Sequence, residues 1–319
     1  MGQRISAARE RKTIDMLFTT KSAAEKRKNF RDDLASGKLL RFPGAFNPLC
    51  AQMIEQKGGF DGVYISGAVM AADLCLPDIG LATMTEFVDR GQQISRVTDL
   101  PAFIDIDTGF GEPMAAARTV RSMEEAGLSG CHIEDQVMPK RCGHLDGKEI
   151  VPTEIMIQRV KAASDAKRDP NFVLIARSDA RAVEGLDASI DRMKAYVDAG
   201  ADMIFPEAMK SEKEFEAVRK ALDVPILANM TEFGKSRLLN YTELEALGFN
   251  VVIYPVTTLR LAMGACDVGL DRILKDGDQN GILDMMQHRR DLYQTLRYHD
   301  YNKFDESIYN FQVSDTPLD

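Results

Sequence analysis

The sequence has no excess of positive charge and no long apolar run. Its 40 lysine and arginine residues are outnumbered by 49 aspartate and glutamate residues, which gives a formal net charge of −9. A chain with this balance has no general attraction for nucleic acid or for an anionic membrane surface. No apolar stretch approaches the roughly 20 residues that a membrane helix requires, and no signal-peptide hydrophobic region opens the chain. We therefore expect a soluble protein with neither nucleic-acid nor membrane partners.

Cysteine and histidine are also scarce. The chain has five scattered cysteines with no C-x-x-C pair, and four histidines. An odd number of widely spaced cysteines argues against a disulfide framework and against a structural zinc site. This pattern favours the reducing environment of the cytoplasm.

From about residue 39 the sequence alternates short apolar runs with helical stretches. In the helical stretches apolar residues recur every three or four positions, and many stretches end at glycine. Eight apolar runs read as strands: residues 39–45, 61–67, 101–107, 130–136, 172–179, 202–207, 225–230 and 251–256.

Repetition of strand and helix predicts an α/β fold with parallel strands, for which a (β/α)8 barrel and an open doubly wound sheet are the alternatives. Polar residues recur just after the apolar part of the strands. In a barrel these strand ends converge on one face, where active sites are built, so their recurrence favours the barrel. The residues concerned are Ser66, Asp105, Asp107, Glu134, Arg177, Glu207, Asn229 and Thr231.

The ends of the chain read as additions to this barrel. Residues 1–38 are rich in basic residues and predict a solvated helical N-terminal arm, and residues 39–319 predict a single barrel domain with C-terminal helices. The last part of the chain carries five aromatic residues, whose exposure would be costly. We expect this tail to pack on its own barrel or on a neighbouring subunit. The aromatic residues are Tyr298, Tyr301, Phe304, Tyr309 and Phe311.

Three strand-end acids suggest a metal site. Asp105 and Asp107 stand two apart, so their side chains share one face, and Glu134 ends the next strand. Oxygen ligands without histidine or cysteine suit a hard ion such as magnesium. The alternative is that these acids cap helices or pair with arginines.

A second set of residues suits an anionic substrate. Arg177 offers a bidentate cation, and Asn229 and Thr231 offer neutral hydrogen-bonding groups, with Glu207 placed to orient them. Ser66 and its following glycine would present backbone amides as a further anion site. An internal ring of salt bridges is the alternative for the charged members of this set.

The segment Lys140 to His144 gathers two cations, a cysteine and a histidine within five positions. Neighbouring cations lower the pKa of a thiol, so Cys142 could donate a proton or attack a substrate as a nucleophile. Zinc binding lacks enough ligands. A loop cysteine without any role remains a further interpretation.

Several long motifs carry a resemblance to a known family. "DIDTGFG", "HIEDQ", "KRCGH", "ARSDA", "FPEA" and "ANMTEFG" occur in this order over most of the chain. Together they resemble the isocitrate lyase and phosphoenolpyruvate mutase superfamily, and within it the branch that cleaves 2-methylisocitrate to pyruvate and succinate in the methylcitrate cycle. The resemblance implies a barrel whose last helix is exchanged between subunits of a homotetramer, a tricarboxylate substrate, and Mg²⁺ or Mn²⁺ without an organic cofactor.

The resemblance also implies roles for individual residues. Asp105 would bind the metal, and Asp107 and Glu134 would hold its waters. Cys142 would be the acid that protonates the nascent succinate, supported by Lys140 and His144, with Tyr64 as the candidate base and Asp78 in support. The implied substrate-binding residues are Ser66, Gly67, Ala68, Gly143, Arg177, Glu207, Asn229, Thr231, Arg260 and Arg289.

Two departures from the family pattern concern the substrate. Leu145 stands where many members of this branch have an arginine, and Ala68 replaces a common glycine. Isocitrate and dimethylmalate therefore remain alternatives to 2-methylisocitrate. A phosphonate-forming mutase and an inactive scaffold barrel are the rival functions, and the first is disfavoured because such mutases lack the cysteine loop.

Overall fold

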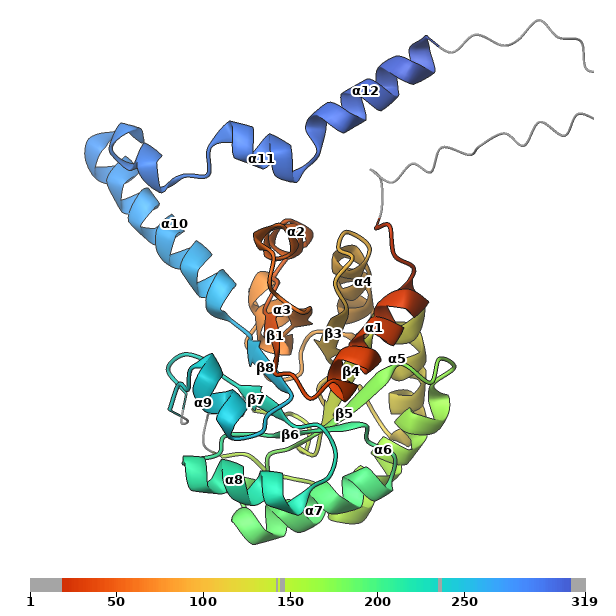
Figure 1. The fold of residues 1–319 in the computed structure, drawn as a ribbon. Helices are drawn as coiled ribbons and strands as arrows, with labels where there is room; N and C mark the ends of the chain where they lie inside the picture. The colour runs from red at the N-terminus through yellow and green to blue at the C-terminus, as the bar shows by residue number, and fades with distance from the viewer. Residues whose placement is uncertain (1–18, 142, 144–146, 235–236, 311–319) are drawn as a thin grey trace, which may run out of the picture.

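The computed structural model describes residues 19–141, 143, 147–234 and 237–310. Parallel strands surrounded by helices form its body, and a helical arm at the C-terminal end leads away from that body (Figure 1). All eight apolar runs form strands, so this prediction is confirmed. The strands are β1 (Leu40–Pro43), β2 (Val63–Ile65), β3 (Ala102–Asp105), β4 (Gly130–Glu134), β5 (Val173–Ser178), β6 (Met203–Pro206), β7 (Leu227–Asn229) and β8 (Val251–Tyr254).

The strands form two parallel sheets, in the orders β2-β3-β4-β5-β6 and β1-β8-β7. In register, Phe103 of β3 lies beside Gly130 of β4, and Leu40 of β1 lies beside Val251 of β8. Isolated parallel bridges link the two sheets at Gly44 with Tyr64 and at Ile204 with Ile226. The fold is therefore α/β with parallel sheets, as the alternation of strand and helix predicts.

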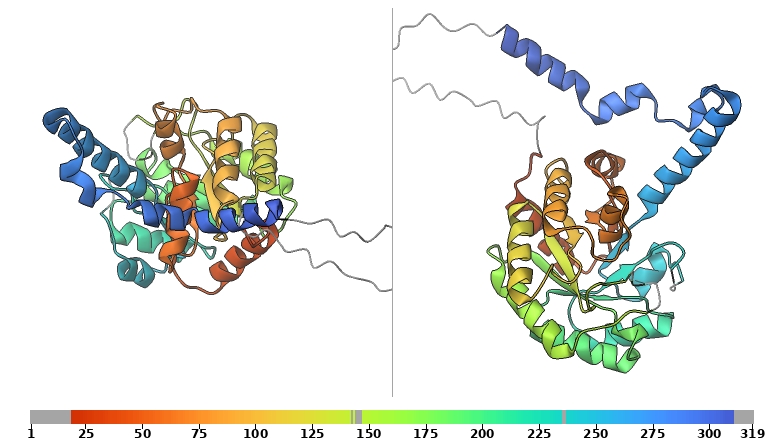
Figure 2. Two further views of the ribbon diagram at one scale, coloured as in Figure 1. Left: turned by 90° about the horizontal axis from the view of Figure 1, so that it is seen from above. Right: turned by 180° about the vertical axis from the view of Figure 1, so that it is seen from behind.

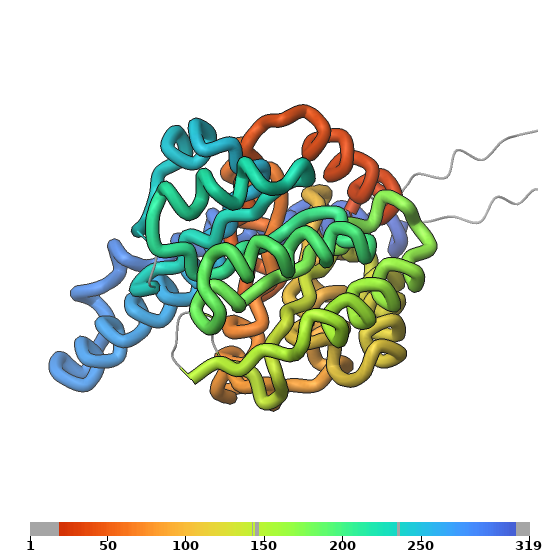
Figure 3. The backbone as a smooth tube through the Cα atoms, turned by 90° about the horizontal axis from the view of Figure 1, so that it is seen from below, coloured from red at the N-terminus to blue at the C-terminus, as the bar shows by residue number. Residues whose placement is uncertain are grey.

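Helices connect the strands and cover the outside of the sheets, as the views from above, behind and below show (Figures 2 and 3). Capping boxes begin several of them, for example Thr83 with Glu86 at α4. The helices are α1 (Ala23–Ala35), α2 (Pro48–Lys57), α3 (Gly67–Asp73), α4 (Met84–Ser95), α5 (Pro113–Glu125), α6 (Thr153–Ala166), α7 (Leu186–Asp198), α8 (Glu212–Ala221), α9 (Tyr241–Ala246), α10 (Thr257–Asp276), α11 (Arg289–Thr295) and α12 (Tyr298–Tyr309), with short 3₁₀ helices η1 (Ala180–Ala182) and η2 (Asn280–Met285).

The strands bury both of their faces, and each face belongs to a different apolar cluster. Ile104 of β3 packs in the large cluster between the strands and the helices. Its neighbour Phe103 points the other way, into an inner cluster to which every strand except β4 contributes. Because side chains alternate along a strand, Asp105 lies on the same inner face as Phe103. The inner apolar layer therefore leads directly to the polar strand ends.

Helix α1 corrects the expectation of a solvated N-terminal arm. The helix is present, but Phe30 and Leu34 are buried, and Phe30 joins the inner cluster with Phe42 and Phe103. The ring centroids of Phe30 and Phe42 are 5.2 Å apart. The basic character of the segment hid these two apolar residues, which stand four apart and so share one helix face. Residues 1–18 lie outside the described part of the chain.

The C-terminal arm carries most of the exposed apolar surface. Helix α10 has no buried residue, and the exposed fractions of Leu270 and Leu274 are 62% and 84%. The chain then turns back, and Thr295 of α11 donates a hydrogen bond of 3.0 Å to Gln56 of α2. The aromatic tail, expected to pack on a barrel, leaves Tyr298, Tyr301 and Tyr309 exposed in the single chain.

Within the described residues, none of the helices combines the length and the apolar character that crossing a membrane demands.

Candidate active site

The predicted site residues gather at the carboxyl ends of the strands. Five strands repeat one arrangement, in which an inner apolar or aromatic residue is followed two positions later by a polar one. The inner residue packs in the middle of the molecule, and the polar residue stands one layer above it on the same face. The pairs are Phe103 and Asp105, His132 and Glu134, Ile175 and Arg177, Phe205 and Glu207, and Leu227 and Asn229.

Four of these polar residues, Asp105, Arg177, Glu207 and Asn229, line a cavity of about 260 Å³, and Glu134 lies behind Arg177. The apolar side of the cavity includes Phe205, Ile253 and Pro255, and its polar side consists of residues predicted from the sequence. Such a volume suits a small molecule better than a polymer. The predicted residues that line it are Tyr64, Ser66, Ala68, Asp78, Asp105, Lys140, Gly143, Arg177, Glu207, Asn229, Thr231 and Arg260.

Asp105 and Asp107 lie at and just after the end of β3 and are joined by a hydrogen bond. The Gly67 N–H donates to Asp105 Oδ2 at 3.2 Å, and the Asp107 N–H donates to Asp105 Oδ1 at 2.9 Å. Burial works against ionisation of Asp105, but His132 in its protonated form, Lys140 and Arg177 lower its pKa below the ordinary value. Burial raises the pKa of Asp107 to about 6. The Gly67 amide, expected to bind substrate, is thus directed at an acid in this structure.

Glu134 is the most isolated acid of the site. It is fully buried, and neither of its carboxylate oxygens has a hydrogen-bond donor among the described residues. Its closest cation is Arg177, whose Nε lies 3.3 Å from Glu134 Oε2. Burial raises the pKa of Glu134 well above its ordinary value, although Arg177 and Lys140 oppose this. A buried carboxyl group without a hydrogen-bond donor can still accept a further partner, such as bound water.

Lys140 joins two of the acids. Its ammonium lies 2.9 Å from Asp107 Oδ1 and also pairs with Asp78. Burial alone would lower the pKa of Lys140, but the surrounding acids, first Glu134 and Asp107, raise it above its ordinary value. Lys140 is therefore a fixed cation of the site and not a base.

Tyr64 reaches the cavity from β2 and meets a histidine that the sequence did not single out. Tyr64 Oη and His132 Nε2 are 2.8 Å apart, and His132 Nδ1 lies 3.6 Å from Asp105 Oδ1. Burial lowers the pKa of His132 to about 4, so the imidazole is neutral at pH 7. Burial and the charge of Asp105 raise the pKa of Tyr64 well above its ordinary value. In this structure Tyr64 therefore holds its proton.

Arg177 is bound by three carboxylates. Asp179 accepts hydrogen bonds from Arg177 Nε at 2.9 Å and from Nη2 at 3.2 Å, and Glu134 and Glu207 lie beside the same guanidinium. Glu207 also accepts a hydrogen bond of 3.3 Å from the Asn229 amide. These carboxylates fix the direction in which the guanidinium faces the cavity.

Two cations from the predicted set differ in their positions. Arg260, at the start of α10, lines the cavity and pairs with Glu232 at 2.8 Å. Arg289 begins α11 on the C-terminal arm and does not line the cavity. Cys142 and His144 lie outside the described residues, so their predicted roles stay predictions.

Four buried residues around the site were missed by the sequence analysis. Three of them, His132, Gln136 and Asp179, lie within the quoted motifs "HIEDQ" and "ARSDA", each two positions from a residue that was chosen. Lys148 lies beyond the glycine that follows the cysteine loop. The available signal was the strand alternation, which places His132 on the same face as Glu134.

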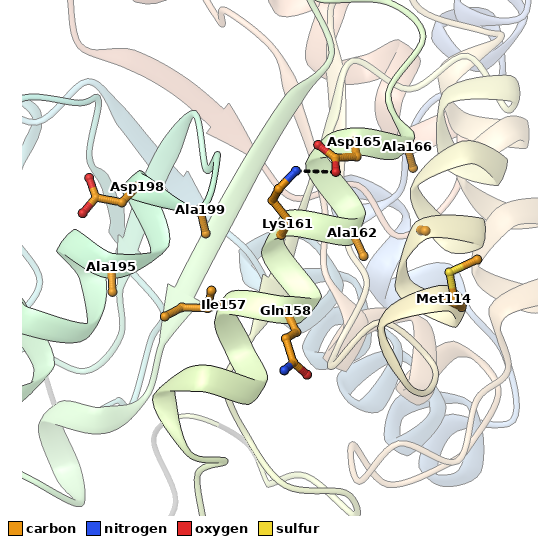
Figure 4. Close-up of a pocket in the computed structure, with 11 residues that line it drawn as sticks. Met114, Ile157, Gln158, Lys161, Ala162, Asp165, Ala166, Ala195, Asp198 and Ala199 are labelled. Carbon is orange, nitrogen blue, oxygen red and sulfur yellow. Dashed lines mark hydrogen bonds and ion pairs between the residues drawn. The ribbon is translucent and has the colours of Figure 1, made fainter.

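A larger hollow lies on the outer surface, away from the strand ends. It has a volume of about 830 Å³ and is formed by side chains of α5, α6 and α7, several of them alanines, beside the ion pair of Lys161 and Asp165 (Figure 4). It contains none of the predicted site residues. Size alone therefore does not locate the candidate active site.

The chain is similar to characterised families over most of its length. Residues 30–274 match the family model for phosphoenolpyruvate phosphomutase. A probable 2-methylisocitrate lyase of Corynebacterium glutamicum is 59% identical over 90% of this chain and 94% of its own length. The 2-methylisocitrate lyase of Bacillus subtilis is 45% identical over 88% of this chain and 92% of its own.

A solved structure supports the same relation. The complex of phosphonopyruvate hydrolase with oxalate and Mg²⁺ aligns with a TM-score of 0.80 and 29% identity, covering 89% of this chain and 99% of that one. The sequence matches and this alignment indicate the same superfamily as the motifs whose residues line the cavity. The chain therefore belongs to the phosphoenolpyruvate phosphomutase family, within the isocitrate lyase and phosphoenolpyruvate mutase superfamily, and its curated relatives include 2-methylisocitrate lyases.

Proposed function

We propose that this protein is a magnesium-dependent carbon–carbon lyase that cleaves 2-methylisocitrate to pyruvate and succinate, in the methylcitrate cycle of propionate breakdown. The observation that carries the proposal is the cavity itself, in which a fixed guanidinium and a fixed ammonium stand among buried acids at the strand ends. Curated relatives with 59% and 45% identity bear the name of this activity.

The acids around the cavity suit a divalent cation. Glu134 is buried without a hydrogen-bond donor among the described residues. Asp105 lines the cavity, and Asp107 pairs with Lys140, which also lines it. The described side chains contain no ready group of three histidine, cysteine or acidic ligands. Magnesium does not require such a group, because it is often held through one or two carboxylates and keeps several waters. Mn²⁺ accepts the same oxygen ligands.

Asp105 would bind the metal directly, and Asp107 and Glu134 would hold its waters. When bound, the ion supplies a Lewis acid for the hydroxyl and carboxylate of the pyruvate half of the substrate. Arg177 supplies a bidentate partner for a substrate carboxylate, and Asn229 and Thr231 add neutral hydrogen bonds. The substrate would therefore be oriented by groups whose positions other side chains already fix.

Proton transfer would involve two places in the site. Cys142 is the proposed acid that protonates the carbanion-like carbon of the leaving succinate, with Lys140 and His144 maintaining its protonation state. Tyr64 is the proposed acceptor of the substrate hydroxyl proton, with Asp78 in support. Because the pKa of Tyr64 is raised in this structure, its role as a base requires a neighbouring cation or a proton path through His132.

A direct assay tests this proposal. Purified protein with magnesium is given 2-methylisocitrate, isocitrate or 2,3-dimethylmalate, and pyruvate, succinate, glyoxylate and propionate are quantified separately. We expect pyruvate and succinate from the methylated tricarboxylate, and loss of this activity in Asp105→Asn and in Cys142→Ser. Predominant glyoxylate from isocitrate would assign the other substrate. Full activity of Cys142→Ser would refute the role of the cysteine as acid.

We further propose that the eight strands close into a (β/α)8 barrel and that the C-terminal arm is exchanged between subunits of a homotetramer. Two bridges already join the sheets, and the apolar side chains of α10 find no cover within the described part of their own chain. Exposed apolar surface of this extent marks an interface. We place the protein in the cytoplasm, because Cys50, Cys75, Cys131 and Cys266 are free thiols.

A further inference from the structure

The loop that contains Cys142 is closed at its base by backbone pairing. Gln136 and Ile150 form an isolated antiparallel bridge, the Val137 N–H donates to the Glu149 carbonyl at 2.9 Å, and the Val151 N–H donates to the Asp135 carbonyl at 2.8 Å. The described residues on either side of position 142 are Arg141 and Gly143. Two further side chains, Gln136 and Lys148, form hydrogen bonds with the backbone of these two residues. Neither side chain has a role in the proposed chemistry.

The first contact is made by the side chain of Gln136. Its Oε1 accepts a hydrogen bond of 2.8 Å from the Arg141 N–H, and its Nε2 donates one of 2.8 Å to the Arg141 carbonyl. The Gln136 side chain is buried. The Gln136 side chain therefore forms two hydrogen bonds with the backbone of Arg141, one to its N–H and one to its carbonyl, as a neighbouring β-strand would.

The second contact is made by the ammonium of Lys148. This group donates to the Gly143 carbonyl and lies 2.9 Å from Asp179 Oδ1, and both side chains of the ion pair are almost completely buried. Burying an ammonium costs free energy unless good partners compensate for it. The two partners here are a loop carbonyl and the carboxylate that holds Arg177.

Asp179 connects this contact to the substrate-binding cation. It binds Arg177 through two hydrogen bonds, and its own N–H donates to Asp135 at 2.8 Å. Gly143 packs directly on the guanidinium, since a Cβ at this position would lie 2.3 Å from Arg177 Nη2. Lys148 thus joins the backbone after the cysteine and the carboxylate behind Arg177 through one charged group.

We propose that Gln136 and Lys148 are positioning residues, which fix the backbone on both sides of position 142 and keep it in register with Arg177. Neither side chain lines the cavity, so each acts through the residues that it holds. The inference rests on the proposed lyase function for its catalytic consequence. The contacts themselves are testable without any substrate.

The test compares Gln136→Met, Lys148→Met and the double variant with wild-type protein. Two measurements are made on each: steady-state cleavage of 2-methylisocitrate, and amide hydrogen exchange of the peptide that spans residues 137–150. We expect kcat to fall roughly 10- to 100-fold in each single variant, as for other supporting partners of reactive groups, while KM changes by less than about threefold. Exchange of the peptide should accelerate about tenfold or more.

The double variant provides a readout that simple loss of stability would not give. Because both side chains hold the same short backbone segment, the loss of kcat in the double variant should be smaller than the product of the two single losses. Gln158→Met and Lys161→Met, which alter exposed residues on α6, serve as matched controls and should leave kcat and exchange unchanged.

Three results would overturn the inference. These are unchanged exchange in both single variants, faster exchange with unchanged kcat, and independent effects that multiply in the double variant. If Lys148→Met does not fold, Gln136→Met, which removes no charge, decides the question by the same two measurements. Absence of cleavage by the wild-type protein would reject the proposed function, and the exchange data would then decide whether the two side chains fix the loop.

Discussion

At the scale of single residues, the site contains more buried carboxyl groups than cationic side chains. Lys140 and Arg177 lie among Asp105, Asp107 and Glu134, with further acids beside them. The pKa values diverge accordingly: that of Asp107 rises to about 6, whereas that of Asp179 falls to about 2. Asp179 keeps its charge because Arg177 and Lys148 outweigh the effect of burial.

Asp179 should therefore stabilise the fold in a pH-dependent manner. Its folded-state pKa lies below the ordinary value of 3.8, so its contribution is present above pH 4 and is lost as the pH falls toward 2. We expect Asp179→Asn to lower the free energy of unfolding by about 2 kcal/mol or more at pH 7. Urea unfolding at several pH values should show this difference shrinking below pH 4. A difference that is constant with pH would contradict the assignment.

Gly143 should tolerate no side chain. A Cβ would lie 2.3 Å from Arg177 Nη2 and 2.6 Å from Glu207 Cγ, so Gly143→Ala must displace the Arg177 guanidinium or the Glu207 side chain. We expect kcat/KM to fall by roughly 100-fold or more with little change in the melting temperature. Gln158→Ala on α6 is the control, since Gln158 is exposed and does not line the cavity. Comparable kinetics for the two variants would show that the guanidinium adjusts freely.

The position of the candidate site was largely predictable because its residues follow a local rule. Asp105, Glu134 and Arg177 stand directly at the ends of apolar runs, so the sequence itself brings them to one edge. His132 and Lys148 escaped because their meaning depends on partners that are distant in the chain: Tyr64 is 68 residues from His132, and Asp179 is 31 residues from Lys148. No local pattern encodes such a pairing.

At the scale of elements, the strands were predictable from the sequence. For helix α1 the sequence predicted the helix but not its packing. The strands are short, apolar and buried on both faces, a pattern that central parallel strands share. In α1 the helix was evident, but its packing depends on Phe30 and Leu34 alone, within a segment of mostly charged residues. Tertiary contacts with Phe42 and Phe103 decide its position.

Removal of the Phe30 ring should consequently destabilise the whole molecule. The Phe30 side chain has no exposed surface. It packs against Phe42 and Phe103, which belong to strands β1 and β3. We expect Phe30→Ala to lower the free energy of unfolding by about 3 to 5 kcal/mol. Lys28→Ala, on the exposed side of α1, is the control and should change it by less than about 0.5 kcal/mol. Chemical denaturation of both variants makes the comparison, and similar stabilities would show that α1 is a dispensable arm.

At the scale of the whole molecule, the C-terminal arm is the feature that a single chain leaves incomplete. Leu270 and Leu274 project from a helix that contacts little of its own body, and Arg289 lies on the same arm, outside the cavity of its own chain. The sequence indicated helices here but not their placement, because an apolar stripe does not reveal which molecule covers it.

Exchange of this arm makes a prediction that mixing can test. If Arg289 acts in the cavity of a neighbouring subunit, unfolding and refolding Arg289→Ala together with Cys142→Ser should restore activity. Random pairing would make half of the dimeric units hybrid, each with one complete site, so about a quarter of the wild-type activity should return. Either variant refolded alone should stay inactive. No recovery in the mixture would mean that Arg289 serves its own chain, and full activity of Arg289→Ala alone would mean that Arg289 has no role.

The inner apolar cluster has a consequence for how the chain is made. It draws residues from β1 near residue 40 through β8 near residue 253, so it cannot be completed until the last strand has left the ribosome. At about 5 to 20 residues per second, Phe42 waits roughly 10 to 40 s for Ile253. During synthesis the apolar strands therefore remain exposed to other chains, whereas the finished molecule buries them. Nascent chains arrested before residue 250 should be captured by chaperones and cleaved readily by proteases.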